Sequence, residues 1–183
     1  MSLRQNICVF CASRIGRNPR YQSAAQQLGQ LIAQGGRTLL YGGSNLGYMG
    51  VVSSAALEYG GNVVGIIPTF FSESIILSQP VSELVQVDSF SARKELMLSR
   101  SDAFIALPGG VGTLDEITEV LAANQLGRIR KPIGLLNVEG YFDPFIAQMA
   151  VLQREGLIRP GLEQTIFVDS DPQRLLARID EFV

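Results

Sequence analysis

The residues best suited to chemistry lie in one short stretch, residues 108–116 (PGGVGTLDE), in which three glycines precede two acids. The apolar run 103–107 predicts a buried strand just before it. The apolar spacing of three and four residues from Leu114 onwards predicts a helix that begins at Thr113. The glycines would then lie at a helix N-terminus, where unpaired N–H groups and the helix dipole favour a phosphate close to the backbone.

The acid at the end of this stretch, Glu116, has two interpretations. Thr113 and Glu116 fit a T-x-x-E capping box, in which the carboxylate only accepts a hydrogen bond from a backbone N–H. The same carboxylate could instead do acid–base or electrostatic work, and spacing alone does not separate the two roles. Asp115 is expected to be a first-turn acid, and Glu119, one turn further on, to support Glu116.

Two neighbouring cations, Arg93 and Lys94, are the second feature that could do chemistry. They fall in the first turn of a helix predicted at 91–98, where each opposes the helix dipole by about 0.3–1 kcal/mol. They either lie on a solvated face or hold an anion, for which the arginine fork is well suited.

A second glycine-rich turn follows the predicted strand 38–41 and contains Gly42, Gly43, Ser44 and Gly47. These glycines either permit a tight turn or contact a phosphate, and we favour the phosphate. Neither turn has the lysine of a P-loop, and the first predicted strand is not followed by a dinucleotide fingerprint. A mononucleotide or a sugar phosphate is therefore the expected ligand.

Composition removes several classes of function. The 183 residues include no histidine, which excludes a Ser-His-Asp triad and a histidine-ligated metal, so no metal site is predicted. The net charge of −2 without a charged block indicates no nucleic-acid or membrane surface, and the apolar runs are too short to span a membrane. We expect a cytoplasmic protein in which Cys8 and Cys11 are buried thiols.

The elements that must position these residues alternate along the whole chain. Short apolar runs predict strands at 6–10, 38–41, 62–67, 84–87, 103–107, 132–136 and 165–168. Helical spacing predicts helices at about 19–34, 51–59, 91–98, 113–125, 142–154 and 172–182, with 69–83 as a loop or irregular helix. This alternation predicts an α/β fold: one Rossmann-like domain over 1–183, a doubly wound parallel sheet in three αβα layers. Both glycine-rich turns would lie at the carboxyl edge of that sheet, where ligands bind.

With these motifs in hand, the sequence resembles the LOG (Lonely Guy) family of cytokinin riboside 5′-monophosphate phosphoribohydrolases, whose members have also been labelled possible lysine decarboxylases. The resemblance extends over nearly the whole chain. It rests on VFCAS at 9–13, YGGSNLGYMG at 41–50, ARKELM at 92–97, DAFIALPGGVGTLDEITEV at 102–120 and QLGRIRKPIGLLNVEGYFDPF at 125–145.

The resemblance implies a Rossmann-like homodimer, with its site near the interface, that hydrolyses the N-glycosidic bond of N6-modified adenosine monophosphates and AMP. It implies no cofactor. By the same resemblance Arg93 and Glu116 look like the catalytic pair. The substrate-binding positions implied by the motifs are Gly43, Ser44, Lys94, Met97, Gly109, Gly110, Gly112 and Thr113.

Two departures and two rival functions accompany this resemblance. The family's usual CGSS is CASR at 11–14, and its usual MHERK is FSARK at 90–94, which points to altered base specificity or dimer contacts. Decarboxylation would need a pyridoxal phosphate lysine, and the chain has few lysines. A non-catalytic nucleotide or cofactor carrier on the same fold would need the glycines but not Glu116.

Overall fold

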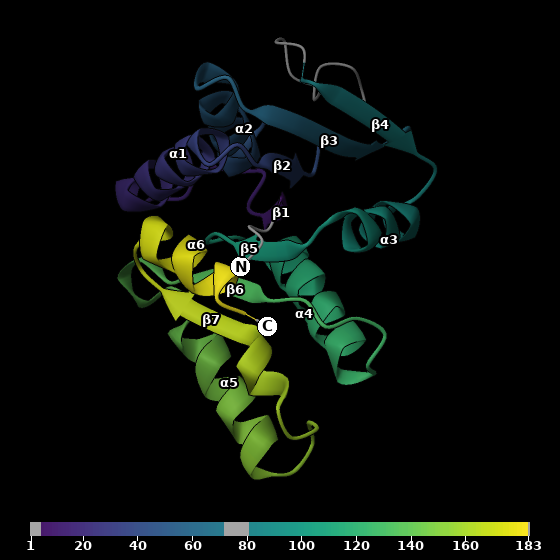
Figure 1. Ribbon diagram of the computed structural model, residues 1–183, viewed down its shortest axis with the longest axis vertical. Coiled ribbons are helices and arrows are strands. Elements are labelled where there is room, and N and C mark those ends of the chain that lie inside the picture. The colour runs from purple at the N-terminus through teal and green to yellow at the C-terminus, as the bar shows by residue number, and fades with distance from the viewer. Residues whose placement is uncertain (1–4, 72–80, 183) are drawn as a thin grey trace.

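The computed structural model describes residues 5–71 and 81–182 and contains one parallel sheet of seven strands in the order β4-β3-β2-β1-β5-β6-β7 (Figure 1). The strands are β1 (Asn6–Phe10), β2 (Thr38–Tyr41), β3 (Asn62–Pro68), β4 (Glu83–Val87), β5 (Ala103–Ala106), β6 (Ile133–Leu136) and β7 (Ile166–Asp169). The predicted parallel α/β sheet is confirmed, whereas most of the loop predicted at 69–83 lies outside the described residues.

Helices cover both faces of this sheet (Figure 1). They are α1 (Pro19–Gln34), α2 (Gly47–Glu58), α3 (Phe90–Arg100), α4 (Val111–Gln125), α5 (Asp143–Arg154) and α6 (Pro172–Asp180). Alternate side chains of a strand point to opposite faces, so Ile7 and Val9 pack in a core with α1, α2 and α6. Cys8 and Phe10 pack in a second core with α3, α4 and α5. The predicted three αβα layers are confirmed.

The direction in which successive strands are added to the sheet reverses at β1, which has β2 on one side and β5 on the other. Cys8 of β1 is in register with Leu40 of β2 on one side and with Phe104 of β5 on the other. Because the strands are parallel, the turns that follow β1, β2 and β5 emerge at the same edge of the sheet. This edge is where doubly wound sheets bind ligands.

Helix starts are the part of the prediction that was wrong. α4 begins at Val111 after Gly110, not at Thr113, and α2 begins at Gly47, not near residue 51. Gly47 begins α2 with a positive φ of 59°, which glycine adopts readily, and α4 begins with Val111 and Gly112 directly after Gly110. A glycine-rich turn can therefore run straight into a helix. α3 begins earlier than predicted, at Phe90, where the Ser89 hydroxyl accepts a 3.0 Å hydrogen bond from the N–H of Ala92.

Cys8 and Cys11 are both free and buried, as predicted. Among the described residues, no helix combines the length and the apolar character needed to cross a bilayer.

Candidate active site

A cavity of about 740 Å³ opens at the carboxyl edge of the sheet. It is lined by three turns, residues 11–16 after β1, residues from the 42–49 segment after β2, and residues 108–113 after β5. The side chains of Arg93 and Glu116 reach it from α3 and α4. The structure therefore brings together both glycine-rich turns and the two residues that the family motif marks as catalytic.

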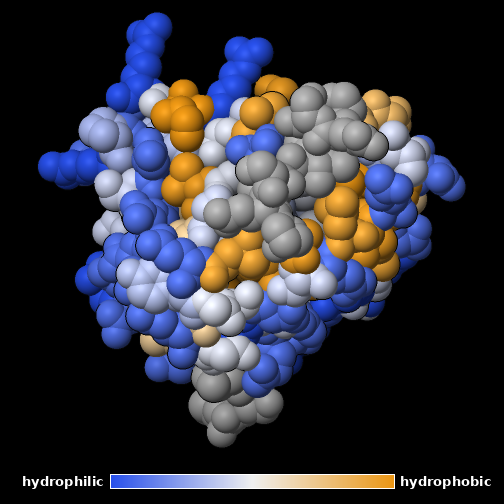
Figure 2. All heavy atoms as spheres, turned by 90° about the horizontal axis from the view of Figure 1, so that it is seen from above, coloured by the Kyte–Doolittle hydropathy of each residue, from blue (hydrophilic) through white to orange (hydrophobic). Residues whose placement is uncertain are grey.

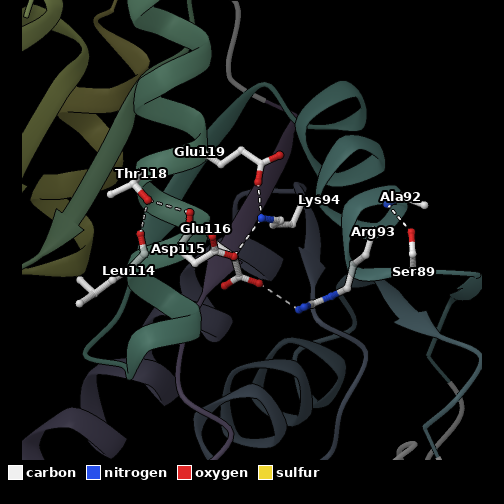
Figure 3. A network of polar contacts seen from close by, with 9 residues as sticks. All are labelled: Ser89, Ala92, Arg93, Lys94, Leu114, Asp115, Glu116, Thr118 and Glu119. Atoms are coloured by element: carbon white, nitrogen blue, oxygen red, sulfur yellow. Dashed lines mark hydrogen bonds and ion pairs between the residues drawn. The ribbon is translucent and has the colours of Figure 1, made fainter.

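Arg93 and Glu116 form an ion pair in which Arg93 Nη2 lies 3.1 Å from Glu116 Oε1 (Figure 3). Their side chains are only 13% and 9% exposed. Arg93 Nε also donates a 3.1 Å hydrogen bond to the carbonyl of Ile66, at the end of β3. A solvated face is therefore the wrong interpretation of Arg93, whose guanidinium is held between α4 and the edge of the sheet.

Gly42 provides the space for this guanidinium. A Cβ at position 42 would lie 2.3 Å from Arg93 Nη2 and 2.6 Å from Met49 Sδ, far inside normal contact distance. The first glycine of the β2 turn therefore allows Arg93 to reach Glu116.

Burial raises the pKa of Glu116 to about 7, although the Arg93 guanidinium acts to lower it; the Asp115 carboxylate raises it further. Glu116 is therefore not fully ionised near neutral pH, because desolvation outweighs the ion pair. Both protonation states of this carboxyl are accessible at neutral pH, which suits a group that accepts and returns a proton.

The capping-box interpretation of Glu116 is also wrong. The N-cap of α4 is Gly110, which makes no side-chain cap hydrogen bond, so Thr113 is inside the helix. The Thr113 side chain lines the cavity and is buried, and its hydroxyl has no hydrogen-bond partner among the described residues. Glu116 thus pairs with Arg93 across to α3, and the buried Thr113 hydroxyl is left without a partner among the described residues.

The three glycines of the β5 turn differ in the space around the position that a Cβ would occupy. A Cβ at Gly109 would lie 2.1 Å from the Thr113 hydroxyl, so packing already requires that glycine. A Cβ at Gly110 or Gly112 would meet no described atom within 4 Å. Glycine at these two positions is instead what a ligand close to the N-terminus of α4 would require.

Sequence reasoning missed Tyr141, which lines the cavity and donates a 2.5 Å hydrogen bond from its hydroxyl to the carbonyl of Gly109. Its ring also packs edge-on against Tyr21 at a centroid distance of 5.5 Å. The available signal was its place five residues beyond the strand predicted at 132–136, at the same edge of the sheet. Tyr141 fixes the Gly109–Gly110 peptide, which two glycines leave free to rotate.

Aromatic side chains form another wall that the sequence did not predict. Phe71 and Phe90 line the cavity, and Phe70 completes a cluster with ring centroids 5.1–5.9 Å apart. Figure 2, which views the molecule from above Figure 1, shows that apolar side chains gather in clusters between polar ones on this face. Such rings offer flat apolar contact area for a planar base.

Three predicted substrate-binding residues do not line the cavity. Lys94 instead makes ion pairs of 2.9 Å with Asp115 and 2.5 Å with Glu119, which raise its pKa and tie α3 to α4 (Figure 3). Met97 is buried between these helices and the sheet. Gly43 has a φ of 75° and packs against Ile67. Their contact with substrate stays a prediction, as does that of Ser44, Gly109, Gly110, Gly112 and Thr113, which do line the cavity.

The fold and the site together define a class: Rossmann-like α/β proteins that hold a nucleotide-sized ligand at the switch point of a doubly wound sheet. Residues 49–179 match the family described as "Possible lysine decarboxylase". The chain is 40% identical over 98% of its length to the cytokinin riboside 5′-monophosphate phosphoribohydrolase LOG of Oryza sativa subsp. japonica, 74% of which is covered. It is also 40% identical to the cytokinin riboside 5′-monophosphate phosphoribohydrolase LOG7 of Arabidopsis thaliana, covering 97% of this chain and 82% of that one. The chain belongs to this LOG family.

Superposition on a solved structure supports the same fold. The molybdenum cofactor binding protein of the phototrophic bacterium Rippkaea orientalis superposes with a TM-score of 0.70 at 26% identity, covering 97% of this chain and 96% of that one. The same architecture therefore occurs in proteins described as binding a cofactor and in proteins described as hydrolases.

Proposed function

We propose that this protein is a phosphoribohydrolase that cleaves the N-glycosidic bond of nucleoside 5′-monophosphates. The substrates are N6-modified adenosine monophosphates and AMP, and the products are the free base and ribose 5-phosphate. The observation that carries the proposal is the buried Arg93–Glu116 pair, 3.1 Å apart, in a cavity beside the N-terminus of α4. The relatives' names supply the same reaction.

In this reaction the bond between the base nitrogen and C1′ of the ribose breaks, and a water oxygen bonds to C1′. The transition state resembles a sugar cation, which the Glu116 carboxylate would stabilise while accepting a proton from the water. The leaving base takes up one proton, so the atoms balance. The N–H groups of residues 109–113 and the Thr113 hydroxyl would hold the 5′-phosphate, with no cofactor required.

The second candidate is a non-catalytic carrier, which the likeness to the cofactor-binding protein of Rippkaea orientalis favours. A carrier needs a cavity and an anion-binding turn but has no use for a buried carboxyl beside an arginine. The retention of both Arg93 and Glu116 therefore favours the enzyme.

We further propose a homodimer with the site near its interface. Phe90 and Val111 line the cavity yet are 50% and 87% exposed, so a second copy could cover them. Light scattering after size-exclusion chromatography would report the mass of a dimer.

A cytoplasmic location is part of the same proposal, and the two free thiols suit a reducing compartment.

The decisive experiment is chromatography of the products formed from AMP and N6-isopentenyl-AMP by the wild type and by Glu116→Gln. We expect free base and ribose 5-phosphate from the wild type, and a kcat lower by about 10²–10⁴-fold for the variant, since a positioned acid–base group contributes that much. No base from either nucleotide would disprove the proposal, and tight AMP binding without turnover would support a carrier. Full activity in Glu116→Gln would remove Glu116 from the mechanism.

A further inference from the structure

The residues that line the cavity carry an unbalanced positive charge. Three of them are formally charged, Arg14, Arg93 and Glu116. Arg93 is paired with Glu116 at 3.1 Å. Arg14 is exposed, and within residues 5–71 and 81–182 no carboxylate forms an ion pair with it. The cavity is therefore left with one uncompensated guanidinium.

The loop that carries Arg14 is anchored on both sides by the first turn of α2. The N–H of Tyr48 donates a 2.9 Å hydrogen bond to the carbonyl of Ala12, and the Tyr48 hydroxyl accepts a 2.8 Å bond from the N–H of Gly16. Gly47, which precedes Tyr48, has a φ of 59° and packs directly against the backbone of the loop. A Cβ at position 47 would lie 2.2 Å from the backbone nitrogen of Arg14. The backbone of Arg14 is thus held in place at the cavity.

The Arg14 loop and the β5 turn begin at neighbouring strand ends. Phe10, the last residue of β1, is in register with Ala106, the last residue of β5, and the N–H of Leu107 donates to the carbonyl of Phe10 at 2.9 Å. Both segments then line the same cavity. An anion at the N-terminus of α4 is therefore within the region that a side chain from residue 14 can reach.

Independent donors for that anion lie on the β5 side. The first turn of α4 presents unpaired N–H groups and the positive end of the helix dipole. Thr113 lines the cavity, and its buried hydroxyl lacks a partner among the described residues. A phosphate there would receive short hydrogen bonds from one side and charge from the other.

We propose that Arg14 is a phosphate-binding residue that makes the cavity select 5′-monophosphates over nucleosides. The inference rests on the proposed function for its substrate and assigns the counter-charge of the phosphate to the β1 loop. Arg93 does not serve as that counter-charge, because its guanidinium is committed to Glu116 and to the carbonyl of Ile66.

The test is calorimetric binding of AMP and adenosine in the Glu116→Gln background, which slows turnover and keeps a side-chain oxygen that can accept a hydrogen bond from Arg93. Arg14→Gln should weaken AMP binding by about 10-fold or more, the usual effect of losing a charge-assisted hydrogen bond, and leave adenosine binding unchanged. Arg14→Lys should retain most of the AMP affinity. The matched control is Arg17→Gln, an exposed arginine three residues further on that does not line the cavity and should bind both ligands as the parent does.

Equal AMP affinity in Arg14→Gln and Arg17→Gln would overturn the inference, as would an equal loss for AMP and adenosine. In the otherwise unchanged protein, Arg14→Gln should raise KM for AMP with little effect on kcat, and a loss in kcat alone would contradict phosphate binding. Release of base by the wild type tests the proposed function separately. A wild type that binds AMP through Arg14 but releases no base would leave this inference standing and remove the hydrolase.

Discussion

The two glycine-rich turns of this protein resemble each other in sequence but meet different requirements. Residues 42–50 follow β2 and residues 108–113 follow β5, and both border the same cavity. In the first turn the glycines make room for other parts of the protein. In the second turn, a Cβ added at two of the three glycines would contact none of the described residues.

Each glycine of the β2 turn has a neighbour that an added Cβ would overlap. A Cβ would collide with the Arg93 guanidinium at Gly42, with Ile67 at Gly43, with the backbone of residues 13–14 at Gly47 and with the carbonyl of Asn45 at Gly50. Gly43 and Gly47 also have positive φ angles. These glycines therefore build the site without needing to touch a ligand, and the sequence-based preference for phosphate contact at Gly43 lacks support from its surroundings.

Gly110 and Gly112 of the β5 turn have ordinary negative φ angles and open space where a Cβ would lie. Neither backbone conformation nor packing explains them, so a close-lying ligand is the remaining physical reason. A shared glycine pattern thus marks two different tasks, and the space around each Cβ distinguishes them.

The largest effect is expected at Gly42, where the β2 turn acts on catalysis indirectly. Gly42→Ala should lower kcat by about 100-fold, because the new Cβ displaces the Arg93 guanidinium from Glu116 and from the Ile66 carbonyl. Stability should change little, since the colliding atoms are the ends of flexible side chains. Steady-state kinetics and thermal unfolding measure the two quantities.

A double-mutant cycle supplies the control for Gly42→Ala. In an Arg93→Gln background the same change should cost almost no further activity, because the displaced group is already gone. Fully additive losses in kcat would show that Gly42 acts by some other route.

Two alanine substitutions compare the turns directly. Gly47→Ala should lower the free energy of unfolding by about 1–3 kcal/mol, since position 47 has a positive φ and faces backbone at 2.2 Å. Gly112→Ala should leave stability equal or higher by up to about 1 kcal/mol, since alanine is the better helix former. The same change should weaken AMP binding by about 10-fold and spare adenosine, by keeping the phosphate from the helix N-terminus.

Denaturant titration and calorimetry measure this pair of variants. The distinction between the turns would fail if Gly112→Ala bound AMP as the wild type does. It would also fail if Gly47→Ala were as stable as the wild type.

A further effect, which involves no glycine, is a pH dependence of stability that belongs to Glu116. The pKa of this carboxyl is raised in the folded protein from 4.5 to about 7 by burial, so the folded state binds the proton more tightly than the unfolded state. The resulting stabilisation is fully present below about pH 4.5 and is lost as the pH rises through about 7. The wild type should therefore lose stability relative to Glu116→Gln between pH 5 and 7, by at most about 1.4 kcal/mol per pH unit.

Thermal unfolding of both proteins at a series of pH values tests this expectation, since all other titrating groups are common to the two. A stability difference that does not vary between pH 5 and 8 would mean that the Arg93 ion pair, and not burial, controls the carboxyl.

Much of the fold was predictable because its signals are local. Short apolar runs for strands, helical spacing between them and glycines at the turns correctly predicted the parallel sheet and its layers, and the cavity opens at the edge where ligands were expected. The helix starts were not predictable from the glycines, since a glycine permits both a turn and the first residue of a helix.

By itself the sequence determined which residues could do chemistry: the absence of histidine left carboxylates and cations, and the motifs selected Glu116, Arg93 and the glycines at 109–112. Only the tertiary structure decided what each of them does. Arg93 faces Glu116, whereas the adjacent Lys94 pairs with Asp115 and Glu119, because successive residues of a helix point in different directions. Tyr141 and Arg14 reach the cavity from distant parts of the chain, and such contacts depend on which strands are neighbours in the sheet.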